Sequence, residues 1–543
     1  MRIQRYLAFG LAWFSLAPLA LSQNVLSINK VPGRIESTAQ QLTHSLEKQG
    51  YEVLRGYFKL FTTDDCDLSY QVMHTCYGNN PAAPYVVPIV PPWPDEWVDP
   101  ATIGALGKTA DGYNATYRLD PHEALVILAQ MPPPAAFFSE KTYLFTRAGN
   151  LCQKSSHYNW VQSNLPAMFS TFFSLVPDEP GRVEIIADLS NNPNSVIMAN
   201  QSGSVWEQLR YFVVTPNPAM DAAIRHAFSK VGIAGQSIFT EKIPGYFGSA
   251  PDDPYRDCPD AADLRFGLDP QADDFVTVLR YAMPVDEAAG DRWKQRLPLV
   301  VLRIRNSAAE EHTYAWEDFD PRTPSVPPET WYNDPPQNYL DTLARAVCDS
   351  WNKPGTPQDC TKWHNFLNMQ ASGLLLTGPA CVPDWMNCIA PSEDSTYMMS
   401  GKLPLDPEHF YAVVGPLGTA TDNATYVGLG SNMSKQQLGF ANLSNEDLKD
   451  TATGYSDAVP SEKFFVTYFA RDCKSLDGQL PAGVGFKCSS IGDKLPYCYT
   501  SADPNCNMLV LSLRDYIRPG TQRAADKDSE LKPRFIFLKI PKK

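Results

Sequence analysis

Two stretches of this 543-residue chain follow the same order of residue types: Glu140-Lys141-Thr142-Tyr143-Leu144-Phe145-Thr146-Arg147 and Glu462-Lys463-Phe464-Phe465-Val466-Thr467-Tyr468-Phe469-Ala470-Arg471. In each, a Glu-Lys pair precedes aromatic, aliphatic and β-branched side chains, and an arginine ends the run. Such runs are typical of strands. We therefore expect buried strands over 142–146 and 464–469.

The same tetrapeptide stands upstream of both stretches, as Asn114-Ala115-Thr116-Tyr117 and Asn423-Ala424-Thr425-Tyr426. This order of landmarks predicts a duplicated β-unit over 112–147 and 421–472, and coincidence between common residue types is the alternative. In a true duplication, Arg147 and Arg471 lie at equivalent strand ends. There, a pair of guanidinium groups could hold carboxylates or an anionic ligand.

Other apolar patterns outline further elements. Helical spacing marks 32–49, 218–231 and 339–351. Strand patterns mark 51–61, 124–128, 182–188, 275–283, 297–304, 410–414, 508–513 and 534–540. Prolines crowd 81–100 and predict extended, polyproline-like structure there. We expect an α+β fold, rich in strands, with mixed or antiparallel sheets, several flanking helices, long Pro-rich loops and disulfide staples.

Length and composition limit the organisation and the partners. A second Pro-rich stretch, 320–336, predicts a linker between an N-terminal α+β domain (23–319) and a C-terminal α+β domain (337–543). The formal net charge is −14, which is unlike the basic surface that binds nucleic acid. We expect no nucleic-acid partner, and the oligomeric state is left open.

The first residues predict secretion. Arg2 and Arg5 precede an apolar run from Tyr6 to Leu21, and small residues lead up to a cleavage position after Ser22, so 1–22 is predicted to be a signal peptide. The alternative is an uncleaved membrane anchor. No later apolar run is long enough to span a membrane, so we expect no stable membrane anchor.

The twelve cysteines agree with secretion, since an even number in an exported chain implies disulfides. Close spacing predicts the bridges Cys66–Cys76, Cys348–Cys360 and Cys381–Cys388. The last four cysteines, Cys473, Cys488, Cys498 and Cys506, would then pair among themselves, which leaves Cys152–Cys258 as a long-range tie.

Five N-x-S/T sequons predict glycosylation at Asn114, Asn200, Asn423, Asn432 and Asn442. An occupied site must face solvent, because a glycan is bulky and hydrated. Three sequons within 423–442 therefore predict an exposed, sugar-coated face rather than a binding surface.

The search for catalytic motifs finds no hydrolase elbow, no zinc motif, no dinucleotide fingerprint and no phosphate loop. The eight histidines are isolated, so we predict no metal site and no cofactor. The best local group is Asp120, His122 and Glu123, whose alternative is a polar turn. Trp93 and Trp97 could stack on a planar ligand, or pack within their loop.

Scattered blocks resemble a family of exported fungal and bacterial proteins without an established activity. They are 112–147, Ala424-Thr425-Tyr426, Phe469-Ala470-Arg471-Asp472-Cys473 and Arg514-Asp515-Tyr516-Ile517-Arg518-Pro519-Gly520-Thr521. The resemblance covers about a fifth of the chain. It implies export and a two-part layout, and it assigns no catalytic residue.

Three hypotheses about function follow. The first is a secreted, disulfide-bonded glycoprotein that binds or transforms a small apolar or aromatic molecule, for example a tailoring enzyme or cyclase of secondary metabolism, since 11% of the residues are aromatic. The second is a secreted carbohydrate-active hydrolase with spatially paired carboxylates. The third is a non-catalytic extracellular or cell-wall glycoprotein. Whether the chain is an enzyme stays open between them.

Overall fold

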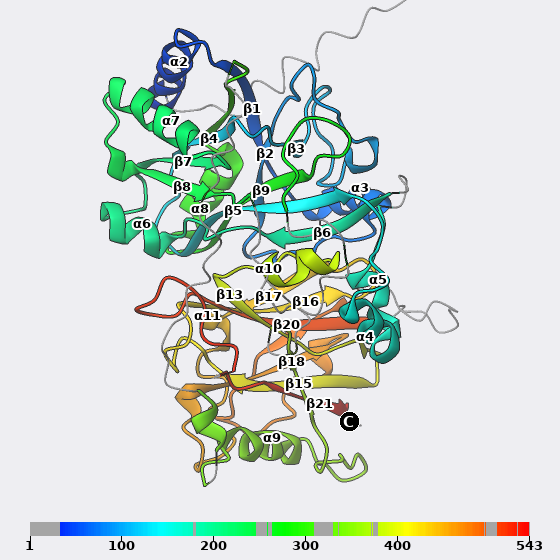
Figure 1. The fold of residues 1–543 in the computed structure, drawn as a ribbon. Helices are drawn as coiled ribbons and strands as arrows, with labels where there is room; N and C mark the ends of the chain where they lie inside the picture. Colours follow the sequence, from blue (N-terminus) through cyan, green and yellow to red (C-terminus); the bar gives the residue numbers. More distant parts are fainter. Residues whose placement is uncertain are drawn as a thin grey trace, which may run out of the picture.

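The computed structural model describes residues 33–176, 181–245, 258, 263–308, 316, 329–334, 336–370, 372, 378–492, 495, 508–528 and 530–541. Strands β1 to β10 form one ten-stranded sheet, and strands β11 to β21 form a five-stranded and a six-stranded sheet. We call residues 33–308 the N-terminal half and residues 329–541 the C-terminal half. Figure 1 shows the two halves stacked on each other, with helices packed around the sheets. The predicted α+β class is confirmed.

The N-terminal sheet runs in the order β6-β5-β9-β2-β1-β10-β4-β7-β8, and β3 pairs with β9. Its strands are β1 (Glu52–Leu60), β2 (Tyr85–Ile89), β3 (Thr116–Arg118), β4 (Glu123–Gln130), β5 (Ala135–Ala148), β6 (Arg182–Asp188), β7 (Leu209–Thr215), β8 (Ile238–Lys242), β9 (Asp274–Pro284) and β10 (Leu299–Arg305). The predicted strand over 142–146 is the buried centre of β5, which pairs with β6 on one side and β9 on the other.

Helices cover this sheet where its faces are apolar. In the N-terminal half they are α2 (Gly33–Glu47), α3 (Cys66–Met73), α4 (Ser156–Asn164), α5 (Phe169–Phe172), α6 (Ser195–Ser202), α7 (Pro218–Lys230) and α8 (Glu287–Arg296). The apolar stripes of α2 and α7 pack on β10, β4 and β7. Both helices begin and end within two residues of the predicted bounds, because their apolar spacing and the Asn217 N-cap are strong local signals.

Strand β2 contradicts the polyproline-like structure predicted over 81–100. Residues Val86–Ile89 pair with β1, and Tyr85 and Val86 also pair with β9. Pro88 lies opposite Phe58 of β1 and beyond the two residues that pair with β9, so β9 needs no N–H from it. A proline-rich stretch can therefore contain a central strand, provided that the proline lies where the strand has a neighbour on one side only.

The C-terminal half contains two sheets that pack face to face. The five-stranded sheet has the order β11 (His364–Asn365), β21 (Arg534–Lys539), β15 (His409–Pro416), β18 (Phe464–Ala470) and β19 (Cys488–Ser490). The six-stranded sheet has the order β12 (Leu367–Asn368), β13 (Ser395–Met399), β20 (Met508–Tyr516), β16 (Tyr426–Met433) and β17 (Leu438–Ser444), and β14 (Leu403–Pro404) pairs with β20.

The layers of this half follow from its cores. Leu429, Leu511 and Leu513 of the six-stranded sheet meet Val413 and Phe465 of the five-stranded sheet in one core. Helix α9 (Tyr339–Ser350) covers the outer face of the five-stranded sheet. The six-stranded sheet thus lies between the five-stranded sheet and the N-terminal half (Figure 1). Two short helices, α10 (Gly378–Cys381) and α11 (Asn445–Leu448), complete this half.

The disulfides confirm the predicted pairing as far as the structure describes it. Three bridges are local and were predicted from spacing: Cys66–Cys76, Cys348–Cys360 and Cys381–Cys388. Cys152–Cys258 is the long-range tie, and Cys473 pairs with Cys488. Cys498 and Cys506 lie outside the described residues, as does the predicted signal peptide. Five disulfides fit an extracellular protein. In the described part of the chain, no helix is long and apolar enough to cross a membrane.

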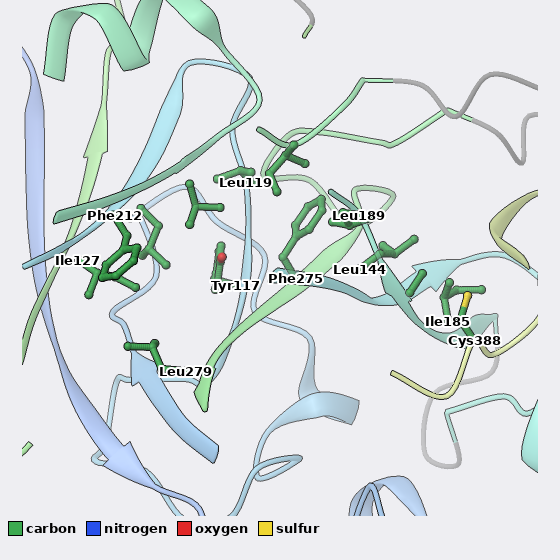
Figure 2. Close-up of a cluster of buried hydrophobic side chains, with 14 of the residues drawn as sticks. Tyr117, Leu119, Ile127, Leu144, Ile185, Leu189, Phe212, Phe275, Leu279 and Cys388 are labelled. Atoms are coloured by element: carbon green, nitrogen blue, oxygen red, sulfur yellow. The ribbon is translucent and has the colours of Figure 1, made fainter. Parts of the chain in front are cut away.

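One segment of the C-terminal half belongs to the core of the N-terminal half. Residues 378–390 insert Val382, Met386 and the Cys381–Cys388 disulfide among apolar side chains of the large sheet. Figure 2 shows Cys388 beside Ile185 in this cluster. The backbone N–H of Cys388 donates to the Ile185 carbonyl at 2.7 Å. The sequence assigned this segment to a separate C-terminal domain, downstream of the predicted linker. Its packing joins the two halves.

The predicted duplication is wrong. Strands β3 and β5 of the first stretch lie in one sheet, where both pair with β9. Strands β16 and β18 of the second stretch lie in two different sheets. The aromatic residues Tyr143, Phe145, Phe465 and Phe469 are buried as expected. Burial alone, however, does not make the two stretches equivalent, so the repeat is a coincidence of common residue types.

The inserted segment generates a stability prediction at Gly149. Its φ is +151°, and a Cβ atom there would lie 2.1 Å from Trp385 Cη2. We expect Gly149→Ala to lower the free energy of unfolding by about 1 kcal/mol for backbone conformation and about 1–3 kcal/mol more for overpacking. Denaturant unfolding measures the change.

The matched control is Gly181→Ala, since Gly181 has φ +98° but no atom within 4 Å of its built Cβ. This variant should show only the conformational part of the loss. Equal losses in the two variants would contradict a tight contact between Gly149 and Trp385.

Candidate ligand-binding site between the two halves

The sequence group Asp120, His122 and Glu123 lies together in one turn, where His122 Nδ1 is 3.7 Å from Asp120 Oδ1 and the Asp120 backbone N–H donates to Glu123 Oε2 at 3.2 Å. The backbone N–H of His122 donates to Asp120 Oδ1 at 2.8 Å, which is turn geometry. Glu123 points into the interior, where it is fully buried and ion-paired with Arg303 at 2.6 Å. The polar-turn alternative therefore describes Asp120 and His122, and Glu123 is a partner of a buried arginine.

The two tryptophans differ in their surroundings. Trp93 is only 2% exposed, and the guanidinium carbons of Arg303 and Arg305 lie 5.3 Å and 4.5 Å from its ring centroid. Trp97 is 43% exposed, and its carbonyl accepts a hydrogen bond from Arg118. The packing alternative fits Trp93, because arginines fill its surroundings.

Arg147 and Arg471 occupy unrelated positions. Arg147 is fully buried and binds Asp273 through two hydrogen bonds of 2.9 Å and 2.8 Å. Arg471 donates to backbone carbonyls, including that of Leu405 at 2.9 Å. The two arginines therefore do not form a shared anion site, because they lie in different halves and each donates hydrogen bonds to other groups of the protein.

The sequons do not mark a common exposed face. Asn200 is exposed, and Asn114 and Asn442 are partly buried. Asn423 is 1% exposed and Asn432 is 6% exposed, so a glycan on either side chain would have no room in this fold. The burial of these two side chains argues against the predicted glycosylation at Asn423 and Asn432. Asn432 and Asn442 lie instead beside residues that meet the other half.

The face that the six-stranded sheet turns toward the N-terminal half is polar and aromatic. Along β20, Ser512, Arg514 and Tyr516 share this face because side chains alternate along a strand. The facing side chains of the N-terminal half include Arg280 of β9, and its Nη2 donates to the Tyr516 hydroxyl at 2.6 Å. Tyr516 also lies 4.7 Å from the Phe137 ring of β5. Two sheets from distant parts of the chain thus form one buried polar cluster.

Part of this contact between the halves is fully satisfied. Asn192 and Asn194 each donate to one carboxylate oxygen of Asp394, both at 2.7 Å. The Ile517 backbone N–H donates to the Asp394 carbonyl at 2.7 Å. All three polar side chains are 0% exposed. A buried polar contact of this kind is favourable because its donors and acceptors are matched.

The loop that follows the Cys66–Cys76 disulfide also reaches across. The N–H groups of Cys76 and Gly78 donate to the carbonyls of Gln436 and Gln437 at 2.7 Å and 2.9 Å. The Gly78 carbonyl then accepts a hydrogen bond from Arg514 Nη2 at 2.5 Å. This loop therefore holds one end of the Arg514 guanidinium group in place.

Arg280 and Arg514 are the charged members of this cluster with unsatisfied N–H groups, and Asn432 Oδ1 and Asn442 Oδ1 are buried acceptors without a partner among the described residues. The two arginines are 5% and 7% exposed. Arg280 Nε and Arg514 Nε and Nη1 are buried without a hydrogen-bond acceptor among the described residues. Neither guanidinium group forms an ion pair with a described carboxylate. An unpaired charge is costly to bury, at about 3–5 kcal/mol when a buried pair is broken.

The interior of the N-terminal half shows the usual treatment of a buried arginine. There, Arg147 pairs with Asp273 at 2.8 Å, Arg182 with Asp99 at 2.6 Å and Arg303 with Glu123 at 2.6 Å. No described carboxylate pairs with Arg280 or Arg514. Arg210 is also buried without a described carboxylate partner, but two of its nitrogens donate to the carbonyls of Leu209 and Ser204.

Tyrosines surround the two arginines. The Arg280 guanidinium carbon lies 5.6 Å from the Tyr85 ring centroid, and that of Arg514 lies 5.7 Å from the Tyr397 ring centroid. Burial raises the pKa of Tyr85 and the pKa of Tyr143 above the usual value for a phenol. These phenols stay neutral at physiological pH and can donate hydrogen bonds.

A stacked tyrosine pair closes one side of the cluster. The rings of Tyr426 and Tyr516 lie 4.9 Å apart. Asn80 and Asn442 each place their amide nitrogen 3.4 Å from the Tyr426 hydroxyl. Burial raises the pKa of Tyr426 to about 12. The cluster as a whole offers guanidinium and phenol donors with aromatic surfaces, which is the chemistry of an anion site.

Sequence reasoning missed this cluster. Arg514 and Tyr516 belong to the block 514–521, for which the sequence predicted no binding role, and Arg280 belongs to the predicted strand over 275–283. The only available signal was the period-two alternation of polar and aromatic residues in strands otherwise expected to be buried. The described residues contain no group of three or more His, Cys, Asp or Glu side chains placed to hold a metal ion.

No family model matches this chain, and no curated protein matches it. A solved structure of an uncharacterized protein from Burkholderia cenocepacia matches over 96% of this chain and 99% of that chain, at 9% identity and a TM-score of 0.34. The VPA0106 protein from Vibrio parahaemolyticus matches over 94% of this chain and 96% of that chain, at 8% identity and a TM-score of 0.34. At such scores, the two structures carry no argument about this site.

The burial of the sequons predicts a pattern of glycan occupancy. We expect sugar on Asn200 and none on Asn423 or Asn432, because only the first side chain is exposed. Mass spectrometry of glycopeptides from the secreted protein measures this. Full occupancy of Asn432 would contradict the packing of this face against the N-terminal half.

Buried carboxyl groups near this interface predict a pH-dependent stability. Burial raises the pKa of Glu184 and of Asp188 to about 7, although Lys141 opposes the shift at Asp188. The folded state thus holds these protons more tightly than the unfolded state. The stabilisation is complete below the unfolded pKa and is lost as pH rises through about 7. For Glu184 alone, it amounts to about 3 kcal/mol.

We therefore expect a higher free energy of unfolding at about pH 5 than at about pH 8. Denaturant unfolding across this range measures it, and Glu184→Gln should flatten the dependence. The control is Glu408→Gln, since Glu408 is exposed. Stability that rises between these two pH values would show that other groups dominate.

Proposed function

We propose that this chain is a secreted, disulfide-bonded protein that binds a small organic anion between its two halves. The observation that carries the proposal is the pair Arg280 and Arg514, buried without carboxylate partners. A bound anion would supply the missing acceptors and the missing negative charge. Secretion rests on the predicted signal peptide together with disulfides that fit an extracellular protein.

The aromatic rings around the two arginines support part of the hypothesis drawn from the sequence. That hypothesis named a small apolar or aromatic molecule, and rings of Tyr85, Tyr397 and Tyr516 do lie around the arginines. The arginines add an anionic group to the expected ligand. A cyclase or tailoring enzyme of secondary metabolism would use such contacts to hold its substrate, so the proposal covers the binding step of that hypothesis.

The carbohydrate hydrolase alternative gains no support from the described carboxyl groups. Glu140 and Glu241 are one interacting pair, and burial together with the charge of Glu241 raises the pKa of Glu140. Both side chains are 0% exposed inside the N-terminal half. A glycosidase needs two carboxyl groups on either side of a sugar, which these positions do not offer.

The test is thermal unfolding with sodium benzoate and sodium phthalate at constant ionic strength. A ligand that binds only the folded state stabilises it by about 2.7 kcal/mol at about 100 times its Kd. We expect at least one of the two anions to raise the midpoint. Arg280→Gln and Arg514→Gln should each reduce the rise, because each removes a charge that the anion would neutralise.

Arg225→Gln is the control. Arg225 has the same charge, but it is bound to Asp221 at 2.9 Å on α7, away from the interface. This variant should keep the full response. A full response in the Arg280 and Arg514 variants, or no response of the native protein to both benzoate and phthalate, would overturn the proposal. Circular dichroism of each variant shows whether it is folded.

A further inference from the structure

We infer that the anion bound between the halves is a dianion with two separate oxyanion groups, one for each arginine, joined by a planar body. This inference rests on the proposed function and names the class of ligand. The two groups are carboxylates in the form that we test, because a planar aromatic dicarboxylate presents two oxyanions on a rigid frame.

The two guanidinium groups are anchored at different places on the same face. Arg280 is held at the Tyr516 hydroxyl, and Arg514 is held at the Gly78 carbonyl. Arg514 and Tyr516 are two residues apart on β20, so their side chains leave the sheet about 7 Å from each other. This spacing favours two binding positions over a single oxyanion shared by both arginines.

The two unpaired guanidinium charges also favour a dianion. Each guanidinium group keeps at least one buried N–H without an acceptor: Nε of Arg280, and Nε and Nη1 of Arg514. A monoanion would neutralise one of the two charges and leave the other buried and unpaired. A dianion neutralises both, and this difference is large where water is excluded.

The body of the ligand is set by the aromatic rings beside the arginines. The Tyr85 ring centroid lies 5.6 Å from the guanidinium carbon of Arg280. Tyr397 lies under Arg514, directly opposite it in the β13–β20 pairing. Both rings are only partly buried, in contrast to Tyr426 and Tyr516, which are 0% exposed. Aromatic faces in this position favour a flat, unsaturated body.

The experiment compares Kd values for phthalate, terephthalate, benzoate and inorganic phosphate by isothermal titration calorimetry at constant ionic strength. We expect at least one of the two dicarboxylates to bind about tenfold or more tightly than benzoate, which corresponds to about 1.4 kcal/mol. In Arg280→Gln and in Arg514→Gln, this preference should fall to within about twofold, because a single guanidinium group is left in either variant. Arg225→Gln should retain the full preference.

Each outcome separates the inference from the proposed function. Binding of benzoate as tightly as either dicarboxylate would leave anion binding intact and overturn the dianion. Phosphate as the tightest ligand would show that the arginines share one oxyanion, which also overturns it. No binding of any of the four probes would instead overturn the proposed function. Because some variants could unfold, Arg280→Lys and Arg514→Lys serve as charge-retaining versions, and they should keep a measurable preference for the dianion.

Discussion

The two halves of this protein meet on buried polar groups, and each of these groups needs a partner from the other side. Asp394 receives amide hydrogen bonds from Asn192 and Asn194, and Tyr516 receives one from Arg280. In a dry contact, an unmatched polar group costs more than a matched one contributes. The position of β20 relative to β9 is therefore fixed by matched hydrogen bonds, whereas a purely apolar contact would tolerate small displacements.

The same constraint explains why an interface can also serve as a binding site. Arg280 and Arg514 are held in place by Tyr516 and Gly78 before any ligand arrives, so less side-chain freedom is lost on binding. Without a ligand, the unpaired buried charges lower the stability of the folded state. Such local destabilisation is typical of functional sites, where stability is lower in exchange for recognition.

Local sequence signals predicted most elements of the fold, while the site depended on contacts that no local signal encodes. The helices at 33–47, 218–230 and 339–350 and the strand at 182–188 matched closely, because apolar spacing and capping act within one element. Closely spaced cysteines predicted the local bridges for a similar reason. Strand β16 was missed, since its glycines and sequons suggested an exposed loop.

The site could not be predicted because Arg280 and Arg514 are 234 positions apart in the chain and are brought to one interface only by the packing of two sheets. Arg147 and Arg471 looked equally suitable in the sequence. What distinguishes the two pairs is the presence or absence of an acceptor, Asp273 for Arg147 and none described for Arg280 Nε. That property belongs to the folded chain.

The insertion of residues 378–390 into the N-terminal core has a consequence for the evolution of this chain. A recombination event at the Pro-rich stretch would separate the large sheet from Val382, Met386 and the disulfide that fill its cluster. The N-terminal half would then contain a cavity in its core, and the C-terminal half would expose an apolar loop. The two halves are therefore expected to be inherited together, and related proteins should carry both halves or neither.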